Sequence, residues 1–201
     1  MTQSINKKLF SSFLKRRSVP FGQHRGDQVE VGDEVAANER LQAALQLIGE
    51  VVFVFSTLES MLADHLCEII NDRSDEPGVI ILHGMLYRQR VDLFERLNRS
   101  FLGYFDSDAK QSARAMFGPL IDELRDLGEL RNQVVHADWG TIDEQGYATV
   151  KTNMTLKGLH ESRMLFDEGF FDALVGRITA ATQQFDDFIQ MRELLLMQRP
   201  K

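Results

Sequence analysis

The sequence contains very little of several residues and patterns on which whole classes of protein depend. It has a single cysteine, Cys67, which excludes an internal disulfide and any zinc site built on several cysteines. Its longest uninterrupted apolar run, Val51 to Phe55, is far shorter than the roughly 18 residues that a membrane span needs. The N-terminal residues contain no apolar stretch long enough for a secretory signal. We therefore expect a soluble, cytoplasmic protein with no membrane partner.

The sequence also has few basic residues relative to acidic ones, and it lacks the loop motifs of common catalytic sites. Lysine and arginine number 23 against 30 acidic residues, which gives a net charge of −7. That charge disfavours bulk electrostatic binding to nucleic acid, although it allows a local basic site. No glycine-rich phosphate loop and no G-x-S-x-G elbow supports nucleotide hydrolysis or related nucleophilic chemistry. Asp64, His65 and Glu68 lie about one helical turn apart, but no complementary E-x-x-H pair completes a metal site. We expect neither a metal nor a cofactor.

What is present is the composition of a soluble globular domain, with 43% hydrophobic and 26% charged residues. A length of 201 residues predicts one domain and a tail. Residues 1–36 are polar, carry early positive charge that includes Arg16 and Arg17, and sustain no helical period. They are predicted to be a polar N-terminal tail, partly ordered at most, and residues 37–201 are predicted to be a helical domain.

Hydrophobic residues at three- and four-residue spacing predict four helices in the rest of the chain. The first begins at residue 37, runs for about 34 residues, and is followed by the helix breakers Pro77 and Gly78. Asp167 is predicted to cap the fourth. The remaining helices are expected at about 79–102, 109–136 and 167–198.

Between the third and fourth helices the apolar period changes to two residues, which is typical of a β-strand. Ala148, Val150 and Met154 alternate with polar residues, and residues 139–143 are expected to pair with this segment across a turn at 144–146. The predicted fold class is all-α: an antiparallel four-helix bundle with a small β-hairpin insertion between helices three and four.

The stretch that carries chemistry is ELRNQVVHADWG, residues 129–140. Arg131 lies on the apolar stripe of its helix, where a half-buried guanidinium needs an anion or several acceptors. Asn132 and His136 are four residues apart and lie on a face shared with Gly128. A glycine inside a helix costs about 1 kcal/mol relative to alanine, and one reason for Gly128 would be close approach of a second helix at that point. Arg131 and His136 diverge by roughly 140° around a straight helix, so they converge best across a symmetric dimer.

An arginine followed by a polar residue, with a histidine at the end of the same helix, resembles the HEPN superfamily and its R-x4-6-H motif. Here the motif reads Arg131-Asn132-Gln133-Val134-Val135-His136. The resemblance implies a HEPN-like helical bundle that acts as a metal-independent endoribonuclease, with its active site composed across a homodimer. It also implies a role as a toxin or phage-defence effector with a neutralising partner protein. Many toxin members have a tyrosine two residues after the histidine, where this chain has Asp138.

The residue types suit RNA cleavage by attack of a ribose 2′-hydroxyl on the adjacent phosphorus. Histidine titrates in the range needed for proton transfer, and arginine presents a planar fork to phosphate oxygens. We predict Arg131, Asn132 and His136 as the catalytic residues and RNA as the substrate. Trp139 could stack on a base, but packing beside the hairpin is the favoured prediction. The alternative function is a non-catalytic HEPN-like module that binds a nucleotide, RNA or a protein, which the negative charge favours.

Further candidate residues each have a plain structural alternative. Glu59 interrupts the apolar stripe of the first helix and is a candidate supporting partner of Arg131, or else a residue at the edge of that stripe. Arg88, Arg96 and Arg99 are candidate contacts to the RNA backbone. Carboxylates four residues away from these arginines favour instead an ion-pair ladder on a solvated face.

Overall fold

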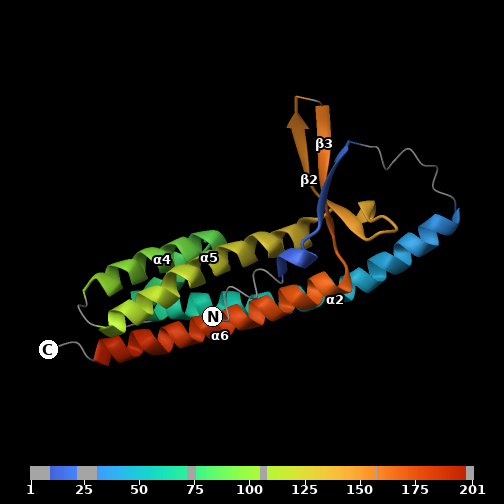
Figure 1. The fold of residues 1–201 in the computed structure, drawn as a ribbon. Helices are drawn as coiled ribbons and strands as arrows, with labels where there is room; N and C mark the ends of the chain where they lie inside the picture. Colours follow the sequence, from blue (N-terminus) through green and yellow to red (C-terminus); the bar gives the residue numbers. More distant parts are fainter. Residues whose placement is uncertain (1–9, 22–30, 72–75, 105–107, 157, 198–201) are drawn as a thin grey trace. The chain divides into compact units, whose positions relative to one another are not determined.

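The computed structural model describes residues 10–21, 31–71, 76–104, 108–156 and 158–197. These residues are mostly helical and include one small antiparallel sheet (Figure 1). The chain divides into two compact units. The mixed unit, which contains the sheet, comprises residues 1–53 and 131–177, and the helical unit comprises residues 54–130 and 178–201.

The helical unit is built around a cluster of phenylalanines. Its helices are α2 (Val31–Ile70), α3 (Glu76–Leu82), α4 (Tyr87–Gly103), α5 (Asp108–His136) and α6 (Glu168–Met197), of which α2, α5 and α6 also continue into the mixed unit. The ring centroid of Phe94 on α4 lies 5.9 Å from that of Phe117 on α5 and 5.1 Å from that of Phe185 on α6. Leu62 and Leu66 on α2 are fully buried one turn apart. Segments of four helices therefore turn their apolar stripes to a common core.

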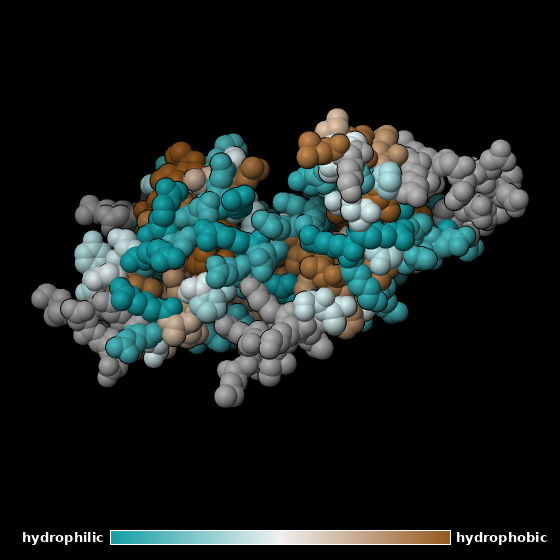
Figure 2. Space-filling model, turned by 45° about the horizontal axis from the view of Figure 1, so that its top comes forward, coloured by the Kyte–Doolittle hydropathy of each residue, from teal (hydrophilic) through white to brown (hydrophobic). Residues whose placement is uncertain are grey.

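The mixed unit contains a three-stranded antiparallel sheet in the order β1-β3-β2. The strands are β1 (Arg16–Pro20), β2 (Tyr147–Thr155) and β3 (Gly158–Leu165). Ser162 on β3 pairs with Ser18 on β1 and with Lys151 on β2, so one row of side chains crosses all three strands. Most of the face shown in Figure 2 is hydrophilic, with apolar side chains at the end of the β2–β3 hairpin, where Met154 and Leu156 are exposed.

Aromatic side chains also form the core of the mixed unit. Phe166 is buried and contacts Trp139 and Phe170, with ring centroids 4.7 Å and 5.4 Å away. Phe10, in a helical turn at residues 10–13, packs on Phe170 with centroids 5.7 Å apart. The segment before β1 is thus anchored to the start of α6 by burial of an aromatic ring.

Two of the predicted helices agree closely with the structure. α5 spans almost the predicted 109–136, although it contains Pro119. α6 begins at Glu168, and Asp167 Oδ1 accepts a hydrogen bond from the Phe170 amide at 2.8 Å. The predicted N-cap is confirmed, because this bond satisfies an amide that the start of a helix leaves open.

The prediction of a single second helix over 79–102 is wrong. The structure separates α3 from α4 by four residues, and one of them, Gly84, has φ +74°. A residue in the left-handed conformation ends a helix, and glycine adopts it without steric cost. Pro77 and Gly78, predicted as helix breakers, lie in the first turn of α3, where a proline loses no helical hydrogen bond.

The polar tail predicted for residues 1–36 contains regular elements that the sequence pattern did not indicate. Arg16–Pro20 forms an edge strand, and α2 begins at Val31, before the predicted residue 37. A strand of five residues is too short to produce a clear period, and its hydrogen bonds go to β3, which is far away in sequence. Pairing with β3, and not the local pattern, therefore defines this strand. The rest of the tail, residues 1–9 and 22–30, lies outside the described residues.

The predicted hairpin is present between the third and fourth expected helices, but the prediction of one of its two strands is wrong. β2 pairs with β3, whereas residues 139–143, which were expected to pair with β2, begin with the short 3-10 helix η2 (Trp139–Thr141). The turn predicted at 144–146 is present: Gly146 has φ +85°, and its amide donates to the Asp143 carbonyl at 2.9 Å. The turn thus ends the loop that leads into β2.

The mean hydropathy of α2 is high, although each of its uninterrupted apolar runs is short. Over Asn38–Ile70 this helix is long and apolar enough to cross a membrane, by length and composition alone. Residues 41–58 contain a single charged residue, Glu50, which keeps their average hydropathy high. Only 22% of its most apolar 18-residue window is buried, and Phe53 is 74% exposed. This result differs from the expectation that no segment approaches a membrane span, although core helices of soluble proteins pass the same test.

His65 on α2 is a buried titratable group in the helical unit. Its Nδ1 lies 3.0 Å from Glu68 Oε2, and its ring packs edge-on to Phe94 and Phe185. Burial lowers the pKa of His65 and prevails over the hydrogen bond to Glu68, which raises it; the positive charge of Arg192 lowers the pKa further. The folded protein therefore disfavours the charged imidazolium.

We expect the protein to lose stability as the pH falls below the ordinary range of histidine. The unfolded chain takes up a proton on His65 near pH 6.5, whereas the folded chain takes it up only at a lower pH, so stability that is complete above pH 6.5 is lost below it. The slope is at most about 1.4 kcal/mol per pH unit. Urea unfolding at about pH 7.5, 6.5 and 5.5 measures it. His65→Leu should flatten the slope, and the exposed His83→Leu should not; equal slopes in wild type and His65→Leu would contradict the expectation.

Gly128 on α5 allows the close approach of α4 that its position in the helix predicts. A Cβ atom at Gly128 would lie 2.8 Å from Cε1 of Tyr87, the first residue of α4. The Tyr87 ring is held in place, because its hydroxyl donates to the Leu124 carbonyl at 3.1 Å and its ring packs on Phe55 with centroids 4.8 Å apart. Burial, followed by the negative charge of Glu59, raises the pKa of Tyr87, so the hydroxyl stays protonated and donates.

Gly128→Ala should therefore destabilise the protein, although alanine favours helix. The gain in helix propensity is about 1 kcal/mol, and the cost of overpacking against a fixed ring is about 1–3 kcal/mol, so we expect a net loss of about 1 kcal/mol. Gly176→Ala is the matched control, because nothing lies within 4 Å of the added Cβ in α6, and it should stabilise. Denaturant titration measures both changes, and stabilisation by both variants would show that Tyr87 moves aside at no cost.

Candidate active site

The predicted catalytic residues lie on the last turns of α5, which end at His136. Leu127, Leu130 and Val134 are buried and define the inward stripe of this part of the helix. Arg131 lies beside the stripe and is half-buried, whereas Asn132 and His136 are exposed. Residues four apart lie one above the other on a helix, so Asn132 and His136 form one exposed face.

Arg131 reaches this face through its long side chain. Its Nη1 donates a hydrogen bond to Asn132 Oδ1 at 3.2 Å. The direction of the Cβ atoms predicts that Arg131 and His136 diverge, but the contact to Asn132 draws the guanidinium towards the face that carries the histidine. The structure thus connects Arg131 to Asn132, which shares its exposed face with His136, within a single chain.

The segment after His136 is tied to the end of α5 by Trp139. The indole Nε1 donates to the Val134 carbonyl at 3.0 Å, and this bond satisfies a carbonyl that a helix end leaves open. The ring packs against Phe166 and Phe171, with centroids 4.7 Å and 6.5 Å away. The expectation that Trp139 packs beside the hairpin is confirmed.

A buried arginine that the sequence analysis missed fixes the loop between η2 and β2. Arg163 on β3 is 1% exposed, and its Nη1 lies 3.1 Å from Asp143 Oδ2. Its Nη2 donates to the carbonyls of Thr141 and Tyr147. Burial lowers the pKa of Arg163, and the charge of Asp143 opposes this change. Arg163 therefore holds the loop that follows the motif against the sheet.

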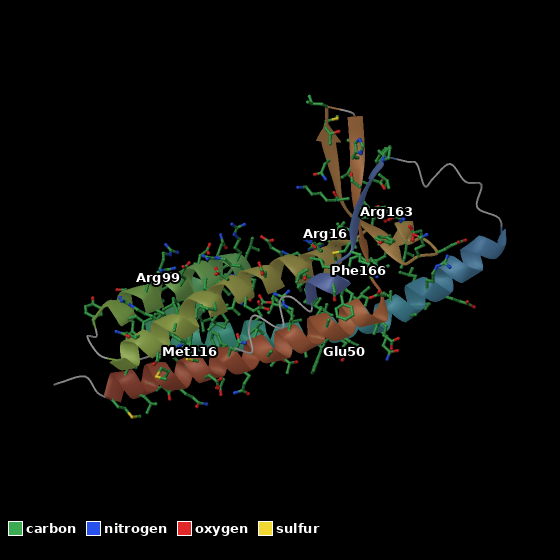
Figure 3. All side chains as sticks on the ribbon, in the orientation of Figure 1. Arg16, Glu50, Arg99, Met116, Arg163 and Phe166 are labelled. Atoms are coloured by element: carbon green, nitrogen blue, oxygen red, sulfur yellow. The ribbon has the colours of Figure 1, made fainter. Side chains whose placement is uncertain are left out.

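The sequence analysis also missed a pocket beside the motif. We define the sheet pocket as the cavity of about 390 Å³ lined by Arg16, Arg17, Ser18, Gln133, Val150, Lys151 and Ser162. Gln133 belongs to the motif segment, and its Oε1 accepts a hydrogen bond from Arg16 Nη2 at 2.8 Å. Figure 3 shows Arg16 and Arg163 at the end of the sheet away from the β2–β3 turn. The early positive charge of the chain is the sequence signal that could have indicated this pocket.

The supporting candidates have other contacts. The ionic partner that the structure gives Glu59 is Arg90, with Nη1 to Oε1 at 3.5 Å. Arg99 pairs with Glu95 at 2.7 Å, so this part of the predicted ion-pair ladder is confirmed. Arg96 Nε donates to the backbone carbonyl of its neighbour one turn earlier, at 3.3 Å.

The predicted ladder is incomplete because α5 supplies a competing cation. The carboxylate of Asp92 binds Arg125 Nη2 at 2.8 Å. In the part of the chain that the structure describes, Asp92 contacts Arg96 only through its backbone carbonyl. Arg125 also binds Glu95. Arg88, Arg96 and Arg99 are exposed residues of the helical unit, and their role as RNA contacts stays a prediction.

Among the described residues, no group of three or more His, Cys, Asp or Glu side chains is placed to hold a metal ion. Comparison with known proteins adds no further assignment: no family model, no curated protein and no solved structure matches this chain. The arrangement at the end of α5 therefore has to be interpreted from its own chemistry. It combines a cation, an amide and an imidazole, which together can bind a phosphate and transfer a proton.

Proposed function

We propose that this chain is a HEPN-like, metal-independent endoribonuclease with an active site composed across a homodimer. The observation that supports the proposal is the group at the end of α5, in which the Arg131 guanidinium is hydrogen-bonded to Asn132 and His136 is exposed one turn further on. In this proposal the segments of α2, α4, α5 and α6 that share the phenylalanine cluster form the antiparallel four-helix bundle of such an enzyme.

The proposed reaction is a transesterification within the RNA. A ribose 2′-oxygen bonds to the adjacent phosphorus while the bond from phosphorus to the 5′-oxygen breaks. His136 takes the proton of the 2′-hydroxyl, and a protonated imidazole gives a proton to the departing 5′-oxygen. Arg131 binds the non-bridging oxygens, where negative charge grows in the transition state. The products are a 2′,3′-cyclic phosphate and a 5′-hydroxyl, and the step consumes no water.

A homodimer matches the number of proton transfers in this reaction. One chain has one His136, whereas the reaction uses a base and an acid. Two chains related by a two-fold axis supply two histidines and two arginines at one site. RNA is then the substrate, in the cytoplasm. A toxin or phage-defence role with a neutralising partner protein follows from the resemblance of the motif.

The second candidate function is a non-catalytic HEPN-like module that binds a nucleotide, RNA or a protein. The observation that favours it is the net charge of −7, which weakens attraction to long RNA. In such a module Arg131 and Asn132 would bind a phosphate without proton transfer by His136.

Incubation of the purified protein with a mixed RNA pool in EDTA tests the proposal. The proposal expects cleavage that leaves cyclic phosphates, that is lost in both Arg131→Ala and His136→Ala, and that comes from a dimer by sedimentation. Absence of cleavage by a folded dimer favours the binding module. Cleavage that persists in both variants would show that residues 131–136 are not the active site.

A further inference from the structure

The sheet pocket has a regular construction from three strands and one helix. Ser18, Ser162 and Lys151 occupy one row across β1, β3 and β2, so their side chains lie on the same face of the sheet. Arg16 precedes Ser18 by two residues and shares this face. The bond from Arg16 to Gln133 joins the face to α5. These five side chains from four elements, together with Arg17 and Val150, line one cavity of about 390 Å³.

The pocket is positively charged in a chain that is negatively charged overall. Its cationic residues are Arg16, Arg17 and Lys151, and none of the described residues that line it is acidic. Arg17 is bound to Asp143, so its charge is offset. Arg16 and Lys151 are exposed, and Arg16 contacts the neutral amide of Gln133. The cavity is therefore positively charged, although the net charge of the whole chain is −7.

The polar groups of the pocket can donate hydrogen bonds to an anion. Because Gln133 Oε1 already accepts from Arg16, the Gln133 side-chain NH₂ is the group left to bind a ligand. The hydroxyls of Ser18 and Ser162 can also donate. A phosphodiester offers only acceptors and one negative charge, which matches this set of two cations, one amide and two hydroxyls.

We propose that the sheet pocket binds a backbone phosphate of the RNA, next to the phosphate that is cleaved. This inference rests on the proposed function for its ligand, but its geometry is independent of catalysis. Gln133 precedes His136 by three residues, which corresponds to about 4.5 Å along the helix and about 60° around it. A strand that enters the pocket therefore continues on the side of α5 that carries His136.

Binding of an RNA that cannot be cleaved tests the pocket separately from the reaction. The probe is a fluorescent single strand of about 12 nucleotides with 2′-O-methyl riboses, titrated by anisotropy at several salt concentrations. Lys151→Gln and Arg16→Gln should each weaken binding about 3- to 10-fold and lower the salt slope by about 0.7. Lys15→Gln is the matched control, because this exposed lysine changes the net charge equally but does not line the pocket. It should alter the affinity by less than about 2-fold.

Each result has a separate meaning for the pocket and for the enzyme. Loss of affinity in the pocket variants, with normal binding by Lys15→Gln, supports the pocket even if the wild type cleaves no RNA, in which case only the proposed function fails. Equal affinity of wild type, Lys151→Gln and Arg16→Gln overturns the pocket while cleavage can still support the enzyme. No binding by the wild type at low salt also overturns it. A mononucleotide that binds as tightly as the strand, with the same dependence on Lys151, would show a nucleotide site and not a backbone site.

Discussion

His136→Ala should lower the rate of RNA cleavage by at least about 100-fold, because a positioned acid or base contributes about 10² to 10⁴ to such reactions. The side chain is exposed at the end of α5, so its removal costs no packing and the melting temperature should stay unchanged. Arg131→Ala should have a loss of similar size, about 100-fold, because it removes the cation that binds the growing negative charge. Single-turnover measurement of cyclic-phosphate ends gives these rates.

Two variants of the same residue types control for nonspecific effects on charge and folding. His83→Ala and Arg114→Ala alter exposed residues of the helical unit that are outside the motif, and both should cleave at the wild-type rate. A wild-type rate in His136→Ala would exclude proton transfer by this residue. A pH–rate profile adds a check, since two histidines acting as base and acid produce a bell-shaped curve.

Asp143→Ala should lower the free energy of unfolding by about 3–5 kcal/mol, which is the usual result of removing one partner of a buried ion pair. The Asp143 carboxylate lies 3.1 Å from the guanidinium of Arg163, and its Oδ1 also accepts from the amides of Gln145 and Tyr147, each at 3.0 Å. Without it, Arg163 keeps two carbonyl acceptors, but its buried charge loses its ion pair, and Arg17 loses the same carboxylate. Urea titration monitored by tryptophan fluorescence measures the change, since Trp139 begins the same loop.

A second substitution distinguishes this explanation from general damage to the loop. Asp143→Ala/Arg163→Met should be more stable than Asp143→Ala alone, because methionine fills the space of the arginine stem without a buried charge. Asp122→Ala, at an exposed position of α5, should change stability by less than about 0.5 kcal/mol. If the double variant loses the sum of both single losses, the buried charge is not the cause.

The parts of the fold that could be predicted are those that depend on residues close together in sequence. α5 and α6 follow from apolar residues at helical spacing, and Asp167 caps α6 through an amide only three residues away. Gly128 indicated a close approach, since a glycine inside a helix needs a reason, although the sequence could not name Tyr87 as the partner. The candidate site is equally local. Arg131, Asn132 and His136 lie within six residues of one helix, where the helical repeat places them.

The rest depends on residues that are distant along the chain, where no spacing gives a signal. β1 exists because β3 pairs with it, and the sheet pocket closes because Arg16 binds Gln133, 117 residues further on. Arg163 follows the polar residues 160–162, as a solvent-facing residue would, yet it is buried because Asp143 and two carbonyls satisfy its guanidinium. Local spacing was enough to predict α5, α6 and the residues of the motif, but not the separation of α3 from α4. Long-range hydrogen bonds and burial, which depend on the complete fold, decided which charges meet beside it.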